Sequence, residues 1–211
     1  MSAAQKISYF GLIRNGIFGE NPVFRVALSL CPAVAVTNTL KSGLLMGVAV
    51  FFVQVMANIS ISIVRKLIHA RIRLPAYILI IGTWVTVANL LLAAYEWPIY
   101  KEIGLYVELI VAFAIILSRA ELFASKNEVV PSLFDGLGMG LGFMFALGAI
   151  SFVRELLGNG ALMGYHVVNT HPVLLFALPM GGFFAVGLLM GFFNWIDIRF
   201  FGGHGASGAG H

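Results

Sequence analysis

The sequence predicts an all-α integral membrane protein, with six transmembrane helices arranged as a 3+3 inverted repeat that contains interrupted helices. Of its 211 residues, 60% are hydrophobic and only 10% are charged, and the mean hydropathy is +0.95. A soluble domain has about one quarter charged residues, so a soluble fold of this length is excluded. The 18 phenylalanines and the scarce charges favour helices, since the strands of a membrane barrel alternate in polarity over about ten residues.

Six stretches come close to the roughly 20 apolar residues that a membrane-spanning helix needs. We place them at Val23–Leu40, Gly43–Val64, Leu74–Tyr95, Leu105–Ala120, Leu133–Val153 and Pro172–Ile196. The resulting organisation is an N-terminal segment at 1–22, a six-span membrane domain at 23–196 and a flexible, glycine-rich tail at 197–211. The opening ten residues contain no long apolar run, so we expect no removable signal peptide.

The connection after the second predicted span sets the orientation. It carries four fixed positive charges in nine residues and no acid, namely Arg65, Lys66, Arg71 and Arg73. Such a loop marks the cytoplasmic side, and with six spans both termini are then cytoplasmic. We expect a multi-pass protein of the cytoplasmic (inner) membrane. The net charge of +4 reflects this topology and does not indicate nucleic-acid binding.

The first predicted span contains the only cysteine of the chain, Cys31, followed by Pro32. Proline removes a backbone donor, so we expect the helix to break or kink there. A break at membrane depth is tolerated only where neighbouring protein or a cavity satisfies the freed backbone groups. Cys31 is therefore a candidate site shared with a partner, because one cysteine excludes an internal disulfide and a cysteine-only metal site made by this chain alone.

Six spans divide into three plus three, and an odd number in each half inserts the second half upside down. Inverted-repeat membrane proteins place their sites near the midplane, on interrupted helices at corresponding positions of the two halves. The counterpart of the first span is the fourth, so we expect a second interruption in Leu105–Ala120.

Three polar side chains inside the predicted spans have two interpretations each. Gln54 and Asn58 are four residues apart and share one helix face. They either hydrogen-bond a neighbouring helix or line an ion or electron path. Glu108 lies about four residues into the fourth span, where a carboxylate is neutral, paired or facing water. It either carries a proton or cation, or holds a paired structural or interfacial position.

The fifth predicted span carries glycines spaced four residues apart, which let another helix approach closely. Gly136 and Gly140 form one such pair, and Gly138 and Gly142 form the other. The same glycines superficially suggest a nucleotide loop, but no strand precedes them and no lysine follows. We predict close helix packing and no dinucleotide site.

Several short motifs occur in a fixed order along the apolar chain. They are Asn21-Pro22, Leu30-Cys31-Pro32, Ala35-Val36-Thr37, Ser118-Arg119-Ala120-Glu121, Phe123-Ala124, Asp135-Gly136, Arg154-Glu155 and Gly158-Asn159-Gly160. Together with six spans, this ordered set resembles the RnfE/NqrD membrane-subunit family, and it is closer to RnfE. The resemblance extends from about residue 20 to residue 195.

The resemblance implies a subunit of a multisubunit, ion-translocating oxidoreductase. In the Rnf form, electrons pass between reduced ferredoxin and NAD, coupled to sodium or proton movement. The paired membrane subunits, RnfE with RnfA or NqrD with NqrE, form inverted repeats and hold an iron–sulfur centre, a 2Fe–2S cluster, through cysteines on interrupted helices. Cys31 matches the first-span ligand. Flavin and NAD are expected on other chains, and the expected partners are an RnfA-like paralogue, other Rnf subunits and the lipid bilayer.

The second expected ligand is missing. Where the family usually has Thr-Asn-Cys, this chain reads Ala112-Phe113-Ala114, and alanine cannot bind iron. Four thiolates are the usual complement, so this chain with an ordinary partner offers three. Glu108 stands where the family tends to have proline or glycine. It lies six residues before Ala114, about 9 Å along a helix, so it does not simply replace the cysteine.

Two other functions stay open at this point. One is a cluster-free scaffold that holds the complex together, with Cys31 as an inert core thiol. The other is an independent ion transporter built on the inverted repeat, with Glu108 as its titrating group. Sodium and protons are equally compatible with the sequence.

Overall fold

The computed structural model describes residues 23–24, 27–65, 67–95, 97–158, 161–162, 165–166 and 178–201. The predicted N-terminal segment at 1–22 lies outside these residues. So do residues 202–211 of the predicted tail and residues 172–177 at the start of the sixth predicted span.

Helices account for nearly all of the described chain, which confirms the all-α prediction. The α-helices are α2 (Leu30–Ala35), α3 (Leu40–Val64), α4 (Arg73–Tyr95), α5 (Trp97–Glu108), α6 (Ala114–Arg119), α7 (Val129–Gly158) and α9 (Pro179–Phe201). Tighter 3₁₀ turns form η2 (Ala70–Ile72) and η3 (Leu109–Ala112), and η4 (Ala120–Ala124) is a π-helical turn. Two short strands, β1 (Ala161–Leu162) and β2 (Tyr165–His166), pair antiparallel after α7.

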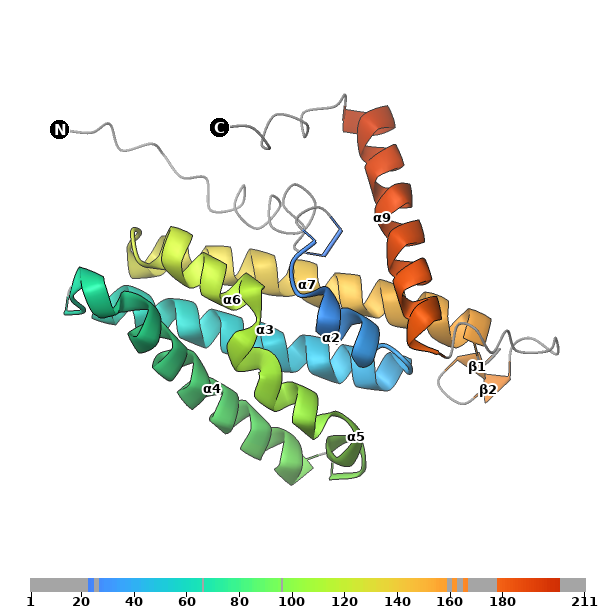
Figure 1. The fold of residues 1–211 in the computed structure, drawn as a ribbon, viewed down its shortest axis with the longest axis horizontal. Helices are drawn as coiled ribbons and strands as arrows, with labels where there is room; N and C mark the ends of the chain where they lie inside the picture. The colour runs from blue at the N-terminus through green and yellow to red at the C-terminus, as the bar shows by residue number, and fades with distance from the viewer. Residues whose placement is uncertain are drawn as a thin grey trace.

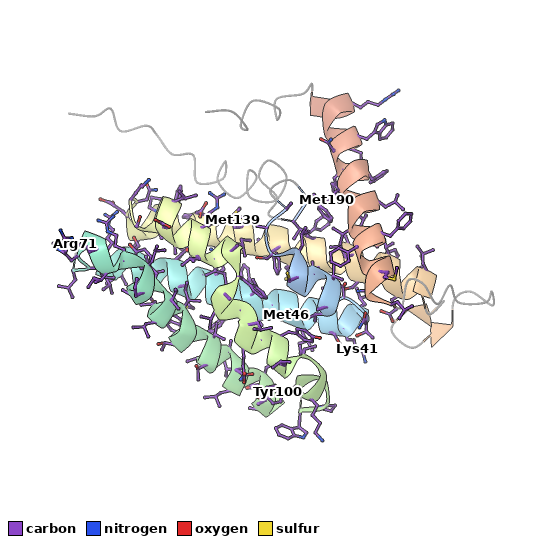
Figure 2. All side chains as sticks on the ribbon, viewed as in Figure 1. Lys41, Met46, Arg71, Tyr100, Met139 and Met190 are labelled. Atoms are coloured by element: carbon purple, nitrogen blue, oxygen red, sulfur yellow. The ribbon has the colours of Figure 1, made fainter. Side chains whose placement is uncertain are left out.

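Four helical segments of the described chain are long and apolar enough to cross a membrane. They are α3, α4, the run Ile103–Ala124 and α7, and α9 contains a shorter apolar stretch at Met180–Ile196. The 25 residues of α3 extend about 37 Å, which exceeds the roughly 30 Å of a hydrocarbon core. Lys41 and Arg71 lie at opposite ends of the bundle (Figure 2). The chain is therefore a multi-pass membrane protein.

The centre of the bundle is the pair α3 and α7, which run side by side, while α9 starts near α2 and projects away (Figure 1). Glycine allows the close approach. A Cβ added to Gly136 would lie 3.1 Å from Asn58 Nδ2, and one added to Gly140 would lie 2.8 Å from Phe51 Cδ2. The predicted role of these two glycines in helix packing is confirmed.

The first predicted span differs from a membrane-crossing helix. Of the described residues before α3, the six of α2 are helical, and a turn at 36–39 leads directly into α3. Pro32 sits in the first turn of α2, where the backbone N–H groups have no intrahelical acceptor to lose. The helix therefore continues through Pro32 and the expected break at this residue is wrong, because the break lies before Leu30.

The fourth predicted span is interrupted, as expected. Four short elements follow one another in place of one α-helix, namely α5, η3, α6 and η4. The backbone leaves helical geometry at Phe113, with φ −68° and ψ 121°. Both interrupted segments thus have a half-helix, α2 in the first and α6 in the second, that begins at a break.

Candidate functional site

The first break comprises residues 27–29, immediately before α2. Ala27 and Ser29 have φ values of 53° and 59°, a left-handed conformation that costs a residue with a Cβ about 1–2 kcal/mol. Strained backbone of this kind persists only when the surroundings hold it, and it concentrates at functional sites. Cys31 follows two residues later, and its side chain is exposed in the single chain.

The second break is at Phe113, between η3 and α6. The Phe113 amide donates to Ile110 O (3.0 Å), and its carbonyl accepts from the amides of Ile116 (3.1 Å) and Leu117 (3.3 Å). These bonds close the turn on one side and start α6 on the other. Ala114, the first residue of α6, is exposed, as Cys31 is.

The two breaks meet. The backbone amide of Ile115 donates to Ser29 Oγ at 3.4 Å, a contact between positions 86 residues apart in the chain. Amides in the first turn of a helix have no intrahelical acceptor, so the serine hydroxyl satisfies one amide of α6. Cys31 and Ala114, the two positions singled out by the family resemblance, each lie within two residues of this contact.

A buried arginine holds the other end of α2. Arg154 Nη1 donates to Val34 O at 2.6 Å and to Thr37 Oγ1 at 2.9 Å, and Nη2 donates to Leu178 O at 3.4 Å. The Thr37 hydroxyl in turn donates to Ala33 O. A cation near the C-terminus of a helix is favourable, because the carbonyl groups there are unsatisfied. Arg154 therefore anchors the cysteine-bearing half-helix to α7 and to the start of α9.

The neighbouring acid holds the next helix. Glu155 Oε2 accepts a hydrogen bond from the backbone amide of Leu40 at 2.6 Å, the first residue of α3. Thr39 caps the same helix by accepting from the Ser42 amide at 3.3 Å. A carboxylate is favourable at a helix N-terminus. The adjacent charges of Arg154 and Glu155 thus fix the two sides of the turn at 36–39, each at the helix end that suits its sign.

Close packing lets α9 join this assembly. A Cβ at Gly182 would lie 2.9 Å from Val34 Cγ1 and 3.1 Å from Arg154 Cζ. A glycine is therefore required where α9 passes over the guanidinium group. The motif Arg154-Glu155 was noted in the sequence, but its targets were not predicted. A charged pair next to the apolar fifth span is the one local signal that could have drawn attention to it.

Another ion pair joins the π-helical end of the second interrupted segment to α7. Arg119 Nη1 lies 3.8 Å from Asp135 Oδ1, and Arg119 Nη2 lies 3.1 Å from Met139 Sδ. Both charged residues belong to the ordered motifs in the sequence. Like the pair at 154–155, they attach an interrupted segment to the continuous helix α7.

Gln54 and Asn58 lie at the interface of α3 and α7, fully buried. Gln54 Nε2 donates to Asn58 Oδ1 at 3.3 Å, and Asn58 Nδ2 donates to Ser132 O at 3.3 Å. Gln54 Oε1 has no hydrogen-bond partner within the described part of the chain. This arrangement is typical of interhelical hydrogen bonding.

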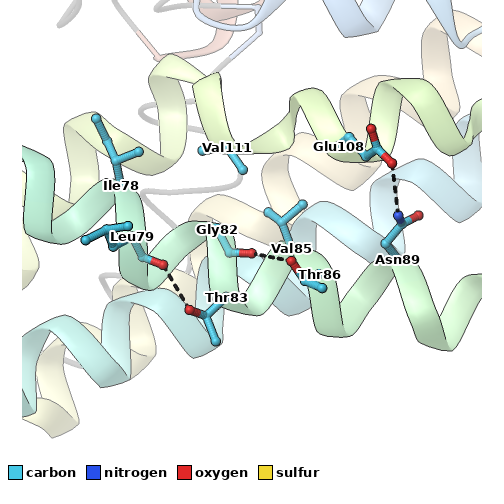
Figure 3. A pocket seen from close by; sticks show the side chains of 9 residues that line it. All are labelled: Ile78, Leu79, Gly82, Thr83, Val85, Thr86, Asn89, Glu108 and Val111. Carbon is cyan, nitrogen blue, oxygen red and sulfur yellow. Dashed lines mark hydrogen bonds between the residues drawn. The ribbon is translucent and has the colours of Figure 1, made fainter.

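Glu108 does not bond either of those two residues and lies in a groove against α4. Its Oε1 accepts from Asn89 Nδ2 at 3.4 Å, across a groove between α4 and the α5–η3 segment (Figure 3). The groove has a volume of about 610 Å³. The structure therefore does not bring together the three residues that the sequence suggested for an ion or proton path.

The metal donors of the site are few. Among the described residues, no three side chains of histidine, cysteine, aspartate or glutamate come together as a metal site. Cys31 offers one sulfur at the junction of the two breaks, and Ala114 offers only a methyl group. The described residues therefore supply one soft donor at this junction, and any metal centre here would need its other ligands from a second chain.

Known proteins match this chain over most of its length. Residues 9–190 match the family described as Rnf-Nqr subunit, membrane protein. The E subunit of the proton-translocating ferredoxin:NAD(+) oxidoreductase complex of Clostridium ljungdahlii is 48% identical over 183 residues, covering 86% of each chain. The E subunit of the Na(+)-translocating ferredoxin:NAD(+) oxidoreductase complex of Acetobacterium woodii is 41% identical over 185 residues, covering 87% of this chain and 94% of that protein.

A third relative shows a similar extent of matching. The E subunit of the ion-translocating oxidoreductase complex of Cellvibrio japonicus is 38% identical over 207 residues, covering 90% of this chain and 87% of that protein. The family match and these identities agree with the ordered motifs and the membrane-spanning helices. This chain belongs to the Rnf-Nqr family of membrane subunits.

Proposed function

We propose that this chain is the E-type membrane subunit of an ion-translocating ferredoxin:NAD oxidoreductase complex. Relatives that are 38–48% identical carry names of this kind. In this role the complex transfers electrons between ferredoxin and NAD and moves sodium ions or protons across the membrane. In this proposal ferredoxin, flavin and NAD bind to other subunits, and the described part of this chain is a bundle of apolar helices with two short strands.

The contribution of this chain is one wall of an intramembrane redox site shared with a paralogous, RnfA-like subunit. The observation that carries this proposal is the junction of the two breaks, where Cys31 is exposed and the Ile115 amide contacts Ser29. An iron–sulfur cluster there supplies one-electron transfer. Cys31 would hold it through one thiolate, Ala114 would contribute no bond, and the partner subunit would provide the remaining ligands.

We also propose the topology that such sharing requires. The halves 23–95 and 105–196 are inverted repeats, and each begins with its interrupted segment. The basic connection that includes Arg65, Arg71 and Arg73 lies on the cytoplasmic side of the inner membrane, with both termini. A cysteine reporter placed in that connection tests the orientation by its labelling with an impermeant reagent in intact cells and inverted vesicles.

Inverted membrane vesicles test the proposed function. The strain lacking this chain is complemented with the wild type or with Cys31→Ala, and ferredoxin-dependent NAD reduction and ion uptake are measured. We expect the deletion and Cys31→Ala both to abolish the two activities, while Cys31→Ala retains a complex of normal subunit composition on a native gel. Normal turnover in the deletion strain would contradict the proposed complex.

Ala114 favours a second candidate, a scaffold subunit without a cluster. In that case Cys31 is an apolar packing residue, and Cys31→Ala supports normal turnover in an intact complex. An independent ion transporter predicts a third result, in which the purified chain moves ions in liposomes without any other subunit or electron donor.

A further inference from the structure

The least buried of the four spanning segments is α4. In its most apolar window 22% of the residues are buried, against 50% in α3 and 56% in α7. Leu79 and Leu90 are 73% and 67% exposed. Lipid accounts for exposed leucines, but it does not account for polar side chains on the same helix, because the hydrocarbon core offers them no partners.

Polar side chains nevertheless line the groove between α4 and the α5–η3 segment. Thr83, Thr86 and Asn89 follow one another at intervals of three, so they share one face of α4. The two threonine hydroxyls donate to Leu79 O and Gly82 O, both at 3.0 Å, so their hydrogens are satisfied within the helix. Asn89 and Glu108 are not satisfied in this way.

At the end of the groove formed by Asn89 and Glu108, hydrogen-bond acceptors outnumber the donors available to them. Asn89 Nδ2 makes one long bond of 3.4 Å to Glu108 Oε1, and Asn89 Oδ1 is buried with no hydrogen-bond partner in the described part of the chain. Glu108 is exposed, and no lysine or arginine of the described residues forms an ion pair with it. Figure 3 shows its carboxylate and the Asn89 amide facing each other across this end of the groove.

A carboxylate inside an apolar span is costly unless it is paired or faces water. Glu108 is the sixth residue of the spanning run Ile103–Ala124. A lysine or arginine side chain from outside the chain would pair with the exposed carboxylate, because it carries a positive charge and only donors. The groove, with Gly82 among its lining residues, has room for the side chains of a helix that lies against α4 and η3.

We infer that this groove docks a membrane-spanning helix of a second subunit, and that a lysine or arginine on that helix pairs with Glu108. The inference rests on the proposed function only in that it requires the chain to belong to a multisubunit membrane complex. The docking surface is separate from Cys31, so it does not depend on the presence of a cluster.

Site-specific photo-cross-linking tests this inference. Benzoylphenylalanine replaces the exposed Thr83, and the complex is irradiated, purified through this subunit in mild detergent and digested for mass spectrometry. The expected product joins Thr83→benzoylphenylalanine to a membrane-spanning segment of another subunit that contains a lysine or arginine. In a Glu108→Gln background the yield falls at least about tenfold. The matched control Glu128→Gln, an exposed acid at the far end of the bundle, leaves the yield unchanged.

The remaining outcomes separate the two proposals. Three results overturn the docking proposal: cross-links to lipid alone, cross-links to a segment without a basic residue, or a yield that Glu108→Gln does not change. If the purified complex is intact in these cases, the proposed function still stands. Absence of every other subunit from the purified wild type overturns both. If Glu108→Gln lowers the amount of subunit in the membrane, exchanging the two charges of the proposed pair tests the docking proposal instead. Glu108→Lys combined with an acid at the cross-linked basic residue restores the cross-link if the pair is real, and does not restore it otherwise.

Discussion

The two breaks of this chain have the same architecture and different chemistry. A half-helix follows each break, and its first turn carries an exposed residue, Cys31 or Ala114. The hydrogen bond from Ile115 to Ser29 joins the two breaks. The first break has left-handed backbone and a sulfur atom, and charged groups on α7 hold its half-helix. The second has ordinary extended backbone, a methyl group and apolar packing, with Ile115 and Ile116 fully buried. Hydrogen bonds from Arg154 thus hold the first half-helix, while apolar packing holds the second.

The largest effect is expected where the second break is packed. Phe143 on α7 is fully buried, and its ring centroid lies 6.4 Å from that of Phe113. Phe143→Ala leaves a cavity beneath Phe113 and should destabilise the chain by about 3–5 kcal/mol. Unfolding in detergent mixtures measures the change. Phe152→Ala, the same substitution at an exposed position of the same helix, is the control and should cost far less.

Removing the charge of Arg154 should loosen α2, the half-helix that follows the first break. Arg154→Leu leaves Val34 O, Leu178 O and the Thr37 hydroxyl without their donor. We expect destabilisation of about 2–3 kcal/mol and faster alkylation of Cys31 by a maleimide, because α2 loses its anchor. Arg154→Lys keeps the charge but lacks the planar fork, so it should fall between the wild type and Arg154→Leu. Unchanged alkylation in Arg154→Leu would show that α2 is held by other contacts.

Loss of the hydrogen bond between the two breaks should destabilise the chain less than loss of Arg154. Ser29→Ala removes the acceptor of the Ile115 amide and keeps a Cβ in the left-handed conformation, so we expect a loss of about 1 kcal/mol. Ser29→Gly also removes the hydroxyl, but it relieves a strain of about 1 kcal/mol. Ser29→Gly is therefore expected to be about as stable as the wild type, and Ser29→Ala about 1 kcal/mol less stable than either. Equal stability of the two variants would mean that the left-handed backbone at residue 29 costs nothing.

The smallest effect on stability is expected at Ala114, where the chemistry of the two breaks differs. Because this residue is exposed, Ala114→Cys should change the stability of the fold by less than about 0.5 kcal/mol. It should nevertheless slow the loss of iron from the purified complex to a chelator, since it adds a thiolate at the second break. An unchanged rate of iron loss would show that position 114 does not face the metal centre.

The sequence predicted the features that depend on local pattern. Apolar runs located the four spanning segments found among the described residues, of the six predicted, and the spacing of Gly136 and Gly140 predicted the close contact between α3 and α7. The predicted break at Pro32 was wrong, because proline disrupts the interior of a helix but is tolerated in its first turn. The start of α2 could not be read from the sequence, since a helix of six residues is too short to show a periodic pattern. Two of the three targets of Arg154, Thr37 and Val34, lie 117 and 120 residues away in the chain. No local pattern specifies contacts at that separation.

Low-temperature electron paramagnetic resonance of the complex, purified in mild detergent through this subunit, tests the central claim most directly. The claim is that Cys31, at the junction of the two breaks, is the ligand this chain contributes to a shared metal centre. Wild type and Cys31→Ala are compared at equal subunit composition. The account predicts an iron–sulfur signal in the wild type that is lost in Cys31→Ala together with the corresponding iron. Identical spectra and iron contents in the two complexes would contradict it.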